Sequence, residues 1–160
     1  MRRNVRLTAY TDYTLRSLMY LAVDRGRPAT IAAIAKAYGI SETHLMKVVH
    51  RLGVAGDIAT VRGRNGGIRL AKAPEAINLG AVIRRTEADM AMVPCFGDAE
   101  SCAIGDVCQL RSVLGEALRA FLAVLDRYTL ADLVAPRRPL ALLLGIAAIG
   151  SADASAGPLL

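Results

Sequence analysis

The first third of the chain alternates apolar stripes with turn residues. In residues 11–24 apolar side chains recur every three or four positions, which predicts a helix capped by Thr11 or Asp12. Two further helices are predicted, one over residues 30–39 and one beginning at Ser41. Two short helices joined by a tight turn that contains glycine are typical of a helix-turn-helix.

The pattern changes to that of a β-hairpin after these helices. Residues 57–71 place two short strand-like stretches around Asn65-Gly66, a dipeptide that favours the tight turn in which both residues have positive φ. A helix-turn-helix followed directly by a basic hairpin predicts a winged helix. The expected fold class is therefore mainly α with a small β-hairpin wing.

The hydrophobic pattern of the second half of the chain predicts one long helix. A short helix is expected from Asn78, and over residues 107–128 apolar positions again recur every three or four residues. A stripe of this length outside the compact N-terminal part suits a dimer seam, with packing against the chain's own domain as the alternative. Thr129 is expected to cap a last short helix, and the chain after Pro136 is rich in Ala, Gly and Ser.

These elements divide the chain into three regions. We expect a winged helix-turn-helix domain for DNA binding in residues 1–75, and the cysteine loop with the dimerisation helix in residues 76–135. Residues 136–160 are expected to form a short C-terminal tail with a flexible end.

Charge is divided unevenly between the two halves. Residues 1–75 contain 13 Lys/Arg and 5 Asp/Glu, whereas residues 76–160 contain 7 and 9. A basic N-terminal half predicts contact with a polyanion, while a solvated basic face is the simpler alternative. In a winged helix, the third helix enters the major groove of double-stranded DNA and the wing follows the backbone or the minor groove. The residues expected to contact DNA are Ser41, Thr43, His44, Lys47, Arg51, Arg62, Arg64, Asn65, Gly66 and Arg69.

Composition excludes several classes of protein. Of the 160 residues, 54% are hydrophobic and 21% are charged, so general disorder is not expected. The longest apolar run, residues 140–149, is about half as long as a membrane-spanning helix, and no secretory leader is visible. We expect a cytoplasmic protein without membrane contact. No catalytic constellation of Ser, His and Asp or of paired carboxylates appears, so an enzyme is not expected.

All three cysteines, Cys95, Cys102 and Cys108, lie within fourteen residues. A disulfide with one free thiol is disfavoured in a reducing compartment. A structural zinc site normally has four ligands, often in C-x₂-C pairs, and the spacings here are six and five residues. Unrelated buried thiols are a third possibility. An iron–sulfur cluster is the fourth, since thiolates favour it and the N-terminus of the long helix suits an anion at Cys108.

Five collinear segments within about residues 6–135 carry a family resemblance. They are LTAYTDYTLRSLMYLA, IAKAYGISETHLMKVVHRLGVAG, VRGRNGGIRLAKAP, the cysteine loop, and LGEALRAFLAVLDRYTLADLV. Together they resemble the NsrR-type transcriptional repressors, which are iron–sulfur winged-helix regulators that sense nitric oxide. The iron-responsive RirA-like and cluster-sensing IscR-like regulators belong to the same family.

The resemblance implies a homodimer that crosses at the long helices. Each protomer would bind an iron–sulfur cluster, [4Fe–4S] or alternatively [2Fe–2S], through Cys95, Cys102 and Cys108, with Asp12 of the partner subunit as the fourth ligand. The cluster-loaded dimer would repress transcription at a DNA operator until nitric oxide reacts with the iron. An iron- or cluster-supply-responsive repressor on the same scaffold is the nearest alternative. A metal-free thiol switch and an electron carrier are more distant ones.

Overall fold

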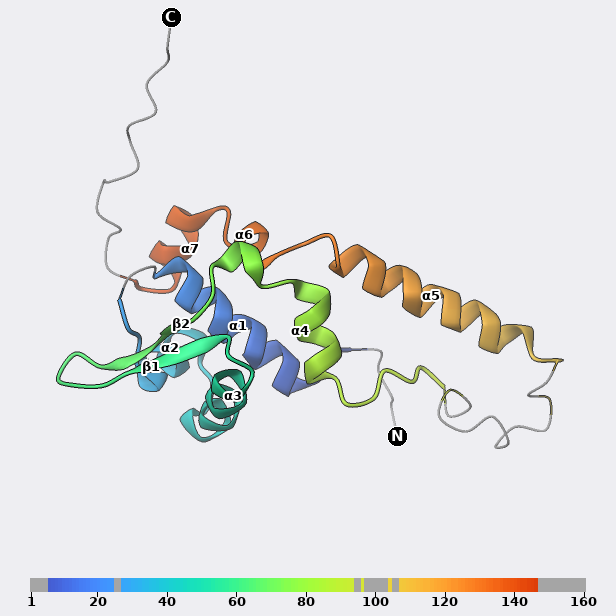
Figure 1. Cartoon of the computed structure of the whole chain (residues 1–160), viewed down its shortest axis with the longest axis horizontal. Helices are drawn as coiled ribbons and strands as arrows, with labels where there is room; N and C mark the ends of the chain where they lie inside the picture. The colour runs from blue at the N-terminus through green and yellow to red at the C-terminus, as the bar shows by residue number, and fades with distance from the viewer. Residues whose placement is uncertain (1–5, 25–26, 94–95, 97–103, 105–106, 147–160) are drawn as a thin grey trace, which may run out of the picture.

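The structure, a computed structural model, describes residues 6–24, 27–93, 96, 104 and 107–146. Its N-terminal part is a winged helix-turn-helix, which confirms the predicted fold class (Figure 1). The elements of this part are α1 (Ala9–Val23), α2 (Ile31–Tyr38), α3 (Glu42–Val54), and the antiparallel strands β1 (Ile58–Val61) and β2 (Gly67–Leu70). The elements that follow are η1 (Pro74–Ala76), α4 (Leu79–Thr86), α5 (Gln109–Leu125), α6 (Leu130–Leu133) and α7 (Arg137–Leu143).

Three helices begin at the polar residues predicted to cap them. Thr30 caps α2 by accepting a hydrogen bond from the Ala33 backbone N–H at 3.1 Å, and Asn78 caps α4 in the same way. Gly39 closes α2 in the left-handed conformation, with φ of 64°. Thr129 begins α6 through a capping box with Asp132.

The predicted cap of the first helix is wrong. The N-cap is Thr8, whose side-chain oxygen accepts a hydrogen bond from the Thr11 backbone N–H at 3.3 Å. Thr11 and Asp12 therefore lie inside the first turn of α1. Thr11 is buried there, and its hydroxyl donates to Thr86 of α4 at 2.9 Å. A residue with this long-range partner is not available to cap the helix.

The predicted two-residue wing turn is also wrong. Val61 pairs with Gly67, so the loop between the strands spans residues 62–66. Gly63 has φ of 109°, and within the described ranges no residue other than glycine, Asn65 included, has a positive φ. Ile68 fixes the register, since it exchanges two backbone hydrogen bonds, of 2.8 and 2.9 Å, with Ala29. This contact with a segment far away in the sequence overrides the local preference of Asn65-Gly66.

One apolar core joins the N-terminal elements to the last two helices. Leu18, Ile34, Leu45 and Leu130 are completely buried within it, and Ala141 of α7 belongs to the same cluster. In addition, the Arg137 Nε donates to the Val23 carbonyl at 3.0 Å. The first part of the predicted C-terminal tail is thus a helix packed on α1. The domain boundaries drawn from the sequence stay a prediction.

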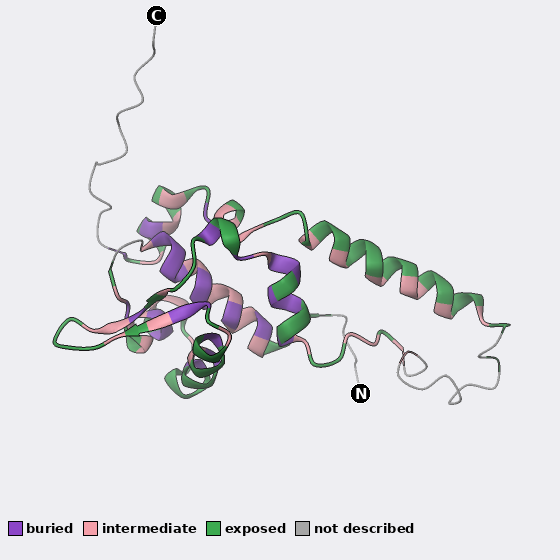
Figure 2. Ribbon diagram, in the orientation of Figure 1, coloured by how far each residue is buried: buried purple, intermediate pink, exposed green. Residues whose placement is uncertain are grey.

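Helix α5 extends away from this core (Figures 1 and 2). None of its residues is buried, and its large exposed apolar side chains are Leu110, Val113, Phe121 and Val124. None of the helices in the part of the chain that the structure describes is long and apolar enough to cross a membrane.

A bidentate ion pair fastens the C-terminal end of α5. Arg84 of α4 donates to both carboxylate oxygens of Asp126, at 2.6 and 2.7 Å, and Asn78 donates to the Asp126 carbonyl at 2.7 Å. The hydrogen bonds from Arg84 lower the pKa of the Asp126 carboxyl below its ordinary value. A carboxyl with a lowered pKa stabilises the fold above its unfolded pKa and loses this effect only as the pH falls through the folded pKa. The attachment of α5 therefore persists at neutral pH.

We predict that Gly67→Ala destabilises the protein by about 1–3 kcal/mol. A β-carbon at this position would lie 2.5 Å from the Ala29 carbonyl oxygen, so the bridge between Ala29 and Ile68 would have to open. The free energy of unfolding, measured by urea denaturation, tests this expectation. Gly53→Ala is the control, because a β-carbon there meets nothing within 4 Å and alanine favours the helix by up to about 1 kcal/mol. Equal stability of the two variants would contradict the prediction.

Candidate DNA interface and cysteine loop

Helix α3 separates a buried apolar face from an exposed polar one. Leu45, Val48 and Leu52 are buried against the core. The predicted DNA-contacting residues of this helix all lie on the exposed side: Ser41, Thr43, His44, Lys47 and Arg51. Hydroxyl, imidazole, ammonium and guanidinium groups on one helix face can reach phosphates and base edges in a major groove. The positions suit the predicted role, and the contacts themselves stay a prediction.

The wing presents three arginines to solvent. Arg62, Arg64 and Arg69 are exposed, as is Asn65, while Gly66 is half-buried in the loop. Within the described ranges none of these arginines forms an ion pair. Their guanidinium groups are thus available to phosphates or to a narrow minor groove.

The N-terminal turn of α1 supports the exposed face of α3 with two aromatic rings. Tyr13 stacks on His44, with ring centroids 6.3 Å apart, and the Arg51 guanidinium carbon lies 5.0 Å from the centroid of the Tyr10 ring. The two rings, with His44 and Lys47, line an apolar hollow of about 220 Å³. Sequence analysis missed these contacts. The spacing of Tyr10 and Tyr13, three apart on one helix face, was the available clue.

Asp12 lies between these two tyrosines in the sequence, at the surface of α1. Its side chain is 44% exposed, and the Arg16 Nε donates to its carboxylate at 2.9 Å. Arg16 in turn lies over the Tyr38 ring of α2, at 5.6 Å. The carboxylate is therefore accessible from outside the protomer, as a ligand contributed to a second subunit would need to be.

Of the three predicted cysteine ligands, Cys95 and Cys102 lie outside the described residues. Cys108 is half-buried at the N-cap of α5, where its side chain makes no capping hydrogen bond. It opens onto a groove of about 430 Å³ along the first turns of α5, which is lined by Phe96, Cys108, Arg111, Ser112, Gly115 and Arg119.

The chemistry of this groove fits an anionic metal–thiolate group. Thiolate is the form of cysteine that binds metals, and the N-terminus of a helix and the Arg111 and Arg119 guanidinium groups that line this groove would favour a bound anion. Among the residues that the structure describes, no three His, Cys, Asp or Glu side chains gather as a metal site. Cys108 is therefore the one predicted sulfur ligand whose surroundings are described.

Comparison with known proteins gives a consistent result. The family model Rrf2, described as an iron-dependent transcriptional regulator, matches residues 7–136. The transcriptional regulator NsrR of Bacillus subtilis is 54% identical over 81% of this chain and 90% of its own length, and NsrR of Geobacillus kaustophilus is 52% identical over 88% and 97%. Among solved structures, IscR of T. potens has a TM-score of 0.68 at 27% identity, covering 83% of this chain and 88% of its own. CymR, the global cysteine regulator of B. subtilis, has a TM-score of 0.66 at 28% identity, covering 83% and 98%.

We predict that Arg64→Ala weakens binding to duplex DNA of any sequence by a similar factor, on the order of tenfold, because we expect this wing arginine to contact phosphates. The slope of log affinity against log salt should also fall by about 1. Fluorescence anisotropy with a selected high-affinity duplex and a random-sequence duplex tests both effects. Arg127→Ala removes an equal charge from an exposed position after α5 and should leave both quantities unchanged. A loss of preference at a single base pair would instead show that the wing reads sequence.

Proposed function

The chain belongs to the Rrf2 family of transcriptional regulators, and we therefore propose that it is a homodimeric repressor that senses nitric oxide through an iron–sulfur cluster. DNA-binding control of transcription, rather than catalysis, is the activity of this family. The observation that carries the finer proposal is the placement of Cys108 at the N-terminus of α5, in a groove with two arginines, in a chain whose other two cysteines precede it by a few residues.

Residues of two protomers would bind the cofactor. Cys95, Cys102 and Cys108 would supply three thiolates, and Asp12 of the partner subunit would supply a carboxylate oxygen. When bound, an iron–sulfur cluster would supply iron with which nitric oxide can react. The Asp12 carboxylate is held by Arg16 in the structure, so ligation requires that this surface ion pair be exchanged. Such pairs contribute at most about 1 kcal/mol, so the exchange costs little.

The dimer would form along α5. Exposed apolar side chains on this helix, among them Val113 and Phe121, have no partner within the described part of the chain that buries them. Burial of such a stripe against a second copy is the usual way in which a long amphipathic helix is stabilised. A dimer would place the two α3 helices at a fixed separation, which selects an operator with two half-sites.

The position of Asp12 also suggests how the cofactor controls DNA binding. Asp12 shares the first turns of α1 with Tyr10 and Tyr13, whose rings contact Arg51 and His44 of α3. When Asp12 gains or loses a ligand role, α1 shifts, and the rings carry the shift to the face that reads DNA. The family description as iron-dependent favours a second candidate, a repressor of the same design that responds to iron supply.

We predict that anaerobically purified protein contains iron and sulfide and has a visible chromophore that a few equivalents of nitric oxide bleach, with release of operator DNA. Iron and sulfide assays, visible absorbance and anisotropy on the same sample test this expectation. A chromophore that ignores nitric oxide but disappears with an iron chelator would select the iron-responsive candidate. Protein that has no sulfide but binds its operator would overturn both.

Cys108→Ser should abolish the chromophore, since serine oxygen is a poor ligand for cluster iron, and the iron content should fall with it. The matched control is Ser112→Ala, which changes a neighbouring residue of the same groove and should leave the chromophore intact. Asp12→Ala should keep the chromophore but make it more labile. Retention of full iron and sulfide in Cys108→Ser would exclude Cys108 as a ligand.

We also predict that Val113→Asp converts the dimer to a monomer, because it places a charge in the apolar face of α5. Val113 is 58% exposed within the protomer, so the fold of the monomer does not depend on its side chain. Size-exclusion chromatography with light scattering gives the mass. Leu142→Asp is the matched control, since Leu142 of α7 is 82% exposed and lies outside α5. A dimer that persists in the Val113 variant would place the interface elsewhere.

A further inference from the structure

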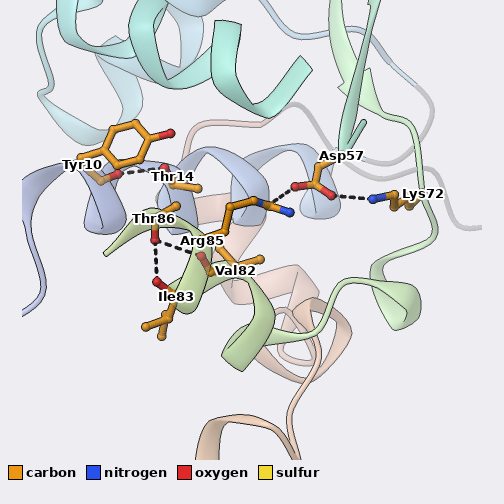
Figure 3. Close-up of polar contacts among 8 residues, drawn as sticks. All are labelled: Tyr10, Thr14, Asp57, Lys72, Val82, Ile83, Arg85 and Thr86. Carbon is orange, nitrogen blue, oxygen red and sulfur yellow. Dashed lines mark hydrogen bonds and ion pairs between the residues drawn. The ribbon is translucent and has the colours of Figure 1, made fainter. Parts of the chain in front are cut away.

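The last turn of α4 and the residue after it connect α4 to three other parts of the molecule. Arg84 binds Asp126 at the end of α5. Arg85 binds Asp57 at the start of the wing (Figure 3). The next two residues reach α1: the Thr86 hydroxyl accepts from Thr11 at 2.9 Å, and the Glu87 carboxylate accepts from the backbone N–H of Thr8 at 2.8 Å.

Asp57 is the least exposed charged residue of this junction, at 3%. It lies where α3 ends and the hairpin begins, and its backbone is fixed on both sides. Its N–H donates to the Leu52 carbonyl at 3.1 Å, and its carbonyl accepts from the Ala71 N–H at 2.8 Å. The carboxylate itself is thus held at the base of the wing.

Two cations satisfy the buried Asp57 carboxylate. The Lys72 Nζ donates to one oxygen at 2.9 Å, and the Arg85 Nη2 donates to the other (Figure 3). A buried carboxylate is costly unless it is paired, so the wing base depends on both donors. Lys72 lies two residues after the end of β2, so it belongs to the same hairpin segment as the wing. Arg85 is the donor that comes from another element, so it ties the wing to α4.

Because the hairpin is long, a small rotation at the ion pair between Arg85 and Asp57 produces a larger displacement at its loop. Its loop begins five residues after Asp57, which corresponds to about 16 Å at the rise of a strand. A rotation of about 10° at the base would displace the loop by about 3 Å, which is more than a hydrogen bond to a phosphate tolerates. A change at the base is therefore felt at Arg62 and Arg64 more than at α3.

We propose that Arg85 is a positioning residue for DNA binding, which acts through Asp57 to hold the wing in the orientation that contacts DNA. No motif in the sequence marked either residue for a role. The inference rests on the proposed contact between the wing and DNA, and it requires neither a cofactor nor nitric oxide.

The test is a double-mutant cycle on DNA affinity with the full-length protein. Arg85→Met should lower affinity for the selected duplex about tenfold and reduce the salt slope by about 1, as the loss of a wing contact does. Combined with Arg64→Ala, it should add less than a factor of two, because the phosphate contact of Arg64, whose loss accounts for the tenfold effect, is already removed. Combined with Lys47→Ala on α3, it should retain its full tenfold effect. General destabilisation would produce the same loss in both backgrounds.

Arg84→Met is the matched control, since it removes the same charge from the neighbouring residue of α4, whose partner is Asp126. It should leave the salt slope unchanged. Arg85→Lys should restore part of the affinity, and it replaces Arg85→Met in the cycle if the methionine variant does not fold.

Three outcomes would overturn the inference. Unchanged DNA affinity of a folded Arg85 variant would show that DNA binding does not need the ion pair between Arg85 and Asp57. Equal losses in the Arg64→Ala and Lys47→Ala backgrounds would show that Arg85 does not act through the wing. If Arg85→Met lowers DNA affinity but Arg64→Ala does not, the wing does not contact DNA through Arg64, and the inference fails. That result would not contradict the proposed cluster-based sensing.

Discussion

The burial of α1 on several sides is the constraint on which the described structure depends. Leu18, Ala22 and Val23 are buried in the common core, and so are the polar residues Thr11, Thr14 and Ser17. A buried hydroxyl must find a partner inside the protein. Thr14 donates to the Tyr10 carbonyl one turn back in α1 at 2.8 Å (Figure 3). Ser17 donates to the Tyr13 carbonyl at 2.7 Å, and Thr11 donates to Thr86 at 2.9 Å. The small hydroxyl side chains let neighbouring elements approach α1 closely without leaving polar atoms unsatisfied.

This burial determines which parts of α1 could move in the proposed switch. A helix fixed along its length by close packing responds as a body, because packed interiors do not deform continuously. The parts of α1 that face outward are near its N-terminus, where Tyr10 and Tyr13 contact α3 and Asp12 meets solvent. In the proposed function, a displacement of Asp12 moves α1 as a rigid body, because its packed part cannot deform. The movement then changes the contacts of Tyr10 and Tyr13 with α3. Arg85 links the wing to α4, and Thr86 links α4 to α1, against which α3 packs, so the two elements proposed to contact DNA share one support.

The sequence predicted those features that depend on local pattern. The apolar stripes located α1, α3 and α5, and Thr30, Asn78 and Thr129 marked helix starts because capping needs only neighbouring residues. Features set by distant partners were not predictable in this way. The wing turn follows the pairing of Ile68 with Ala29, and the tie between Asp57 and Arg85 spans 28 residues. The exposed polar face of α3 followed from its apolar stripe, but the aromatic support from α1 did not, since no local rule brings Tyr10 to Arg51.

Helix α5 shows why the proposed cofactor and the proposed dimer would be thermodynamically coupled. It has 17 residues and none of them is buried, so it lacks the packing from which helices in proteins gain most of their stability. Cys108 lies at its N-cap, so the placement of this thiol depends on whether the helix is formed and held. A second copy that buries the apolar face of α5 would order the helix and with it the position of Cys108. By linkage, a cofactor bound at Cys108 would strengthen the dimer by the same factor by which the dimer strengthens cofactor binding. Loss of the cofactor would then weaken the dimer contact, and with it the fixed separation of the two α3 helices.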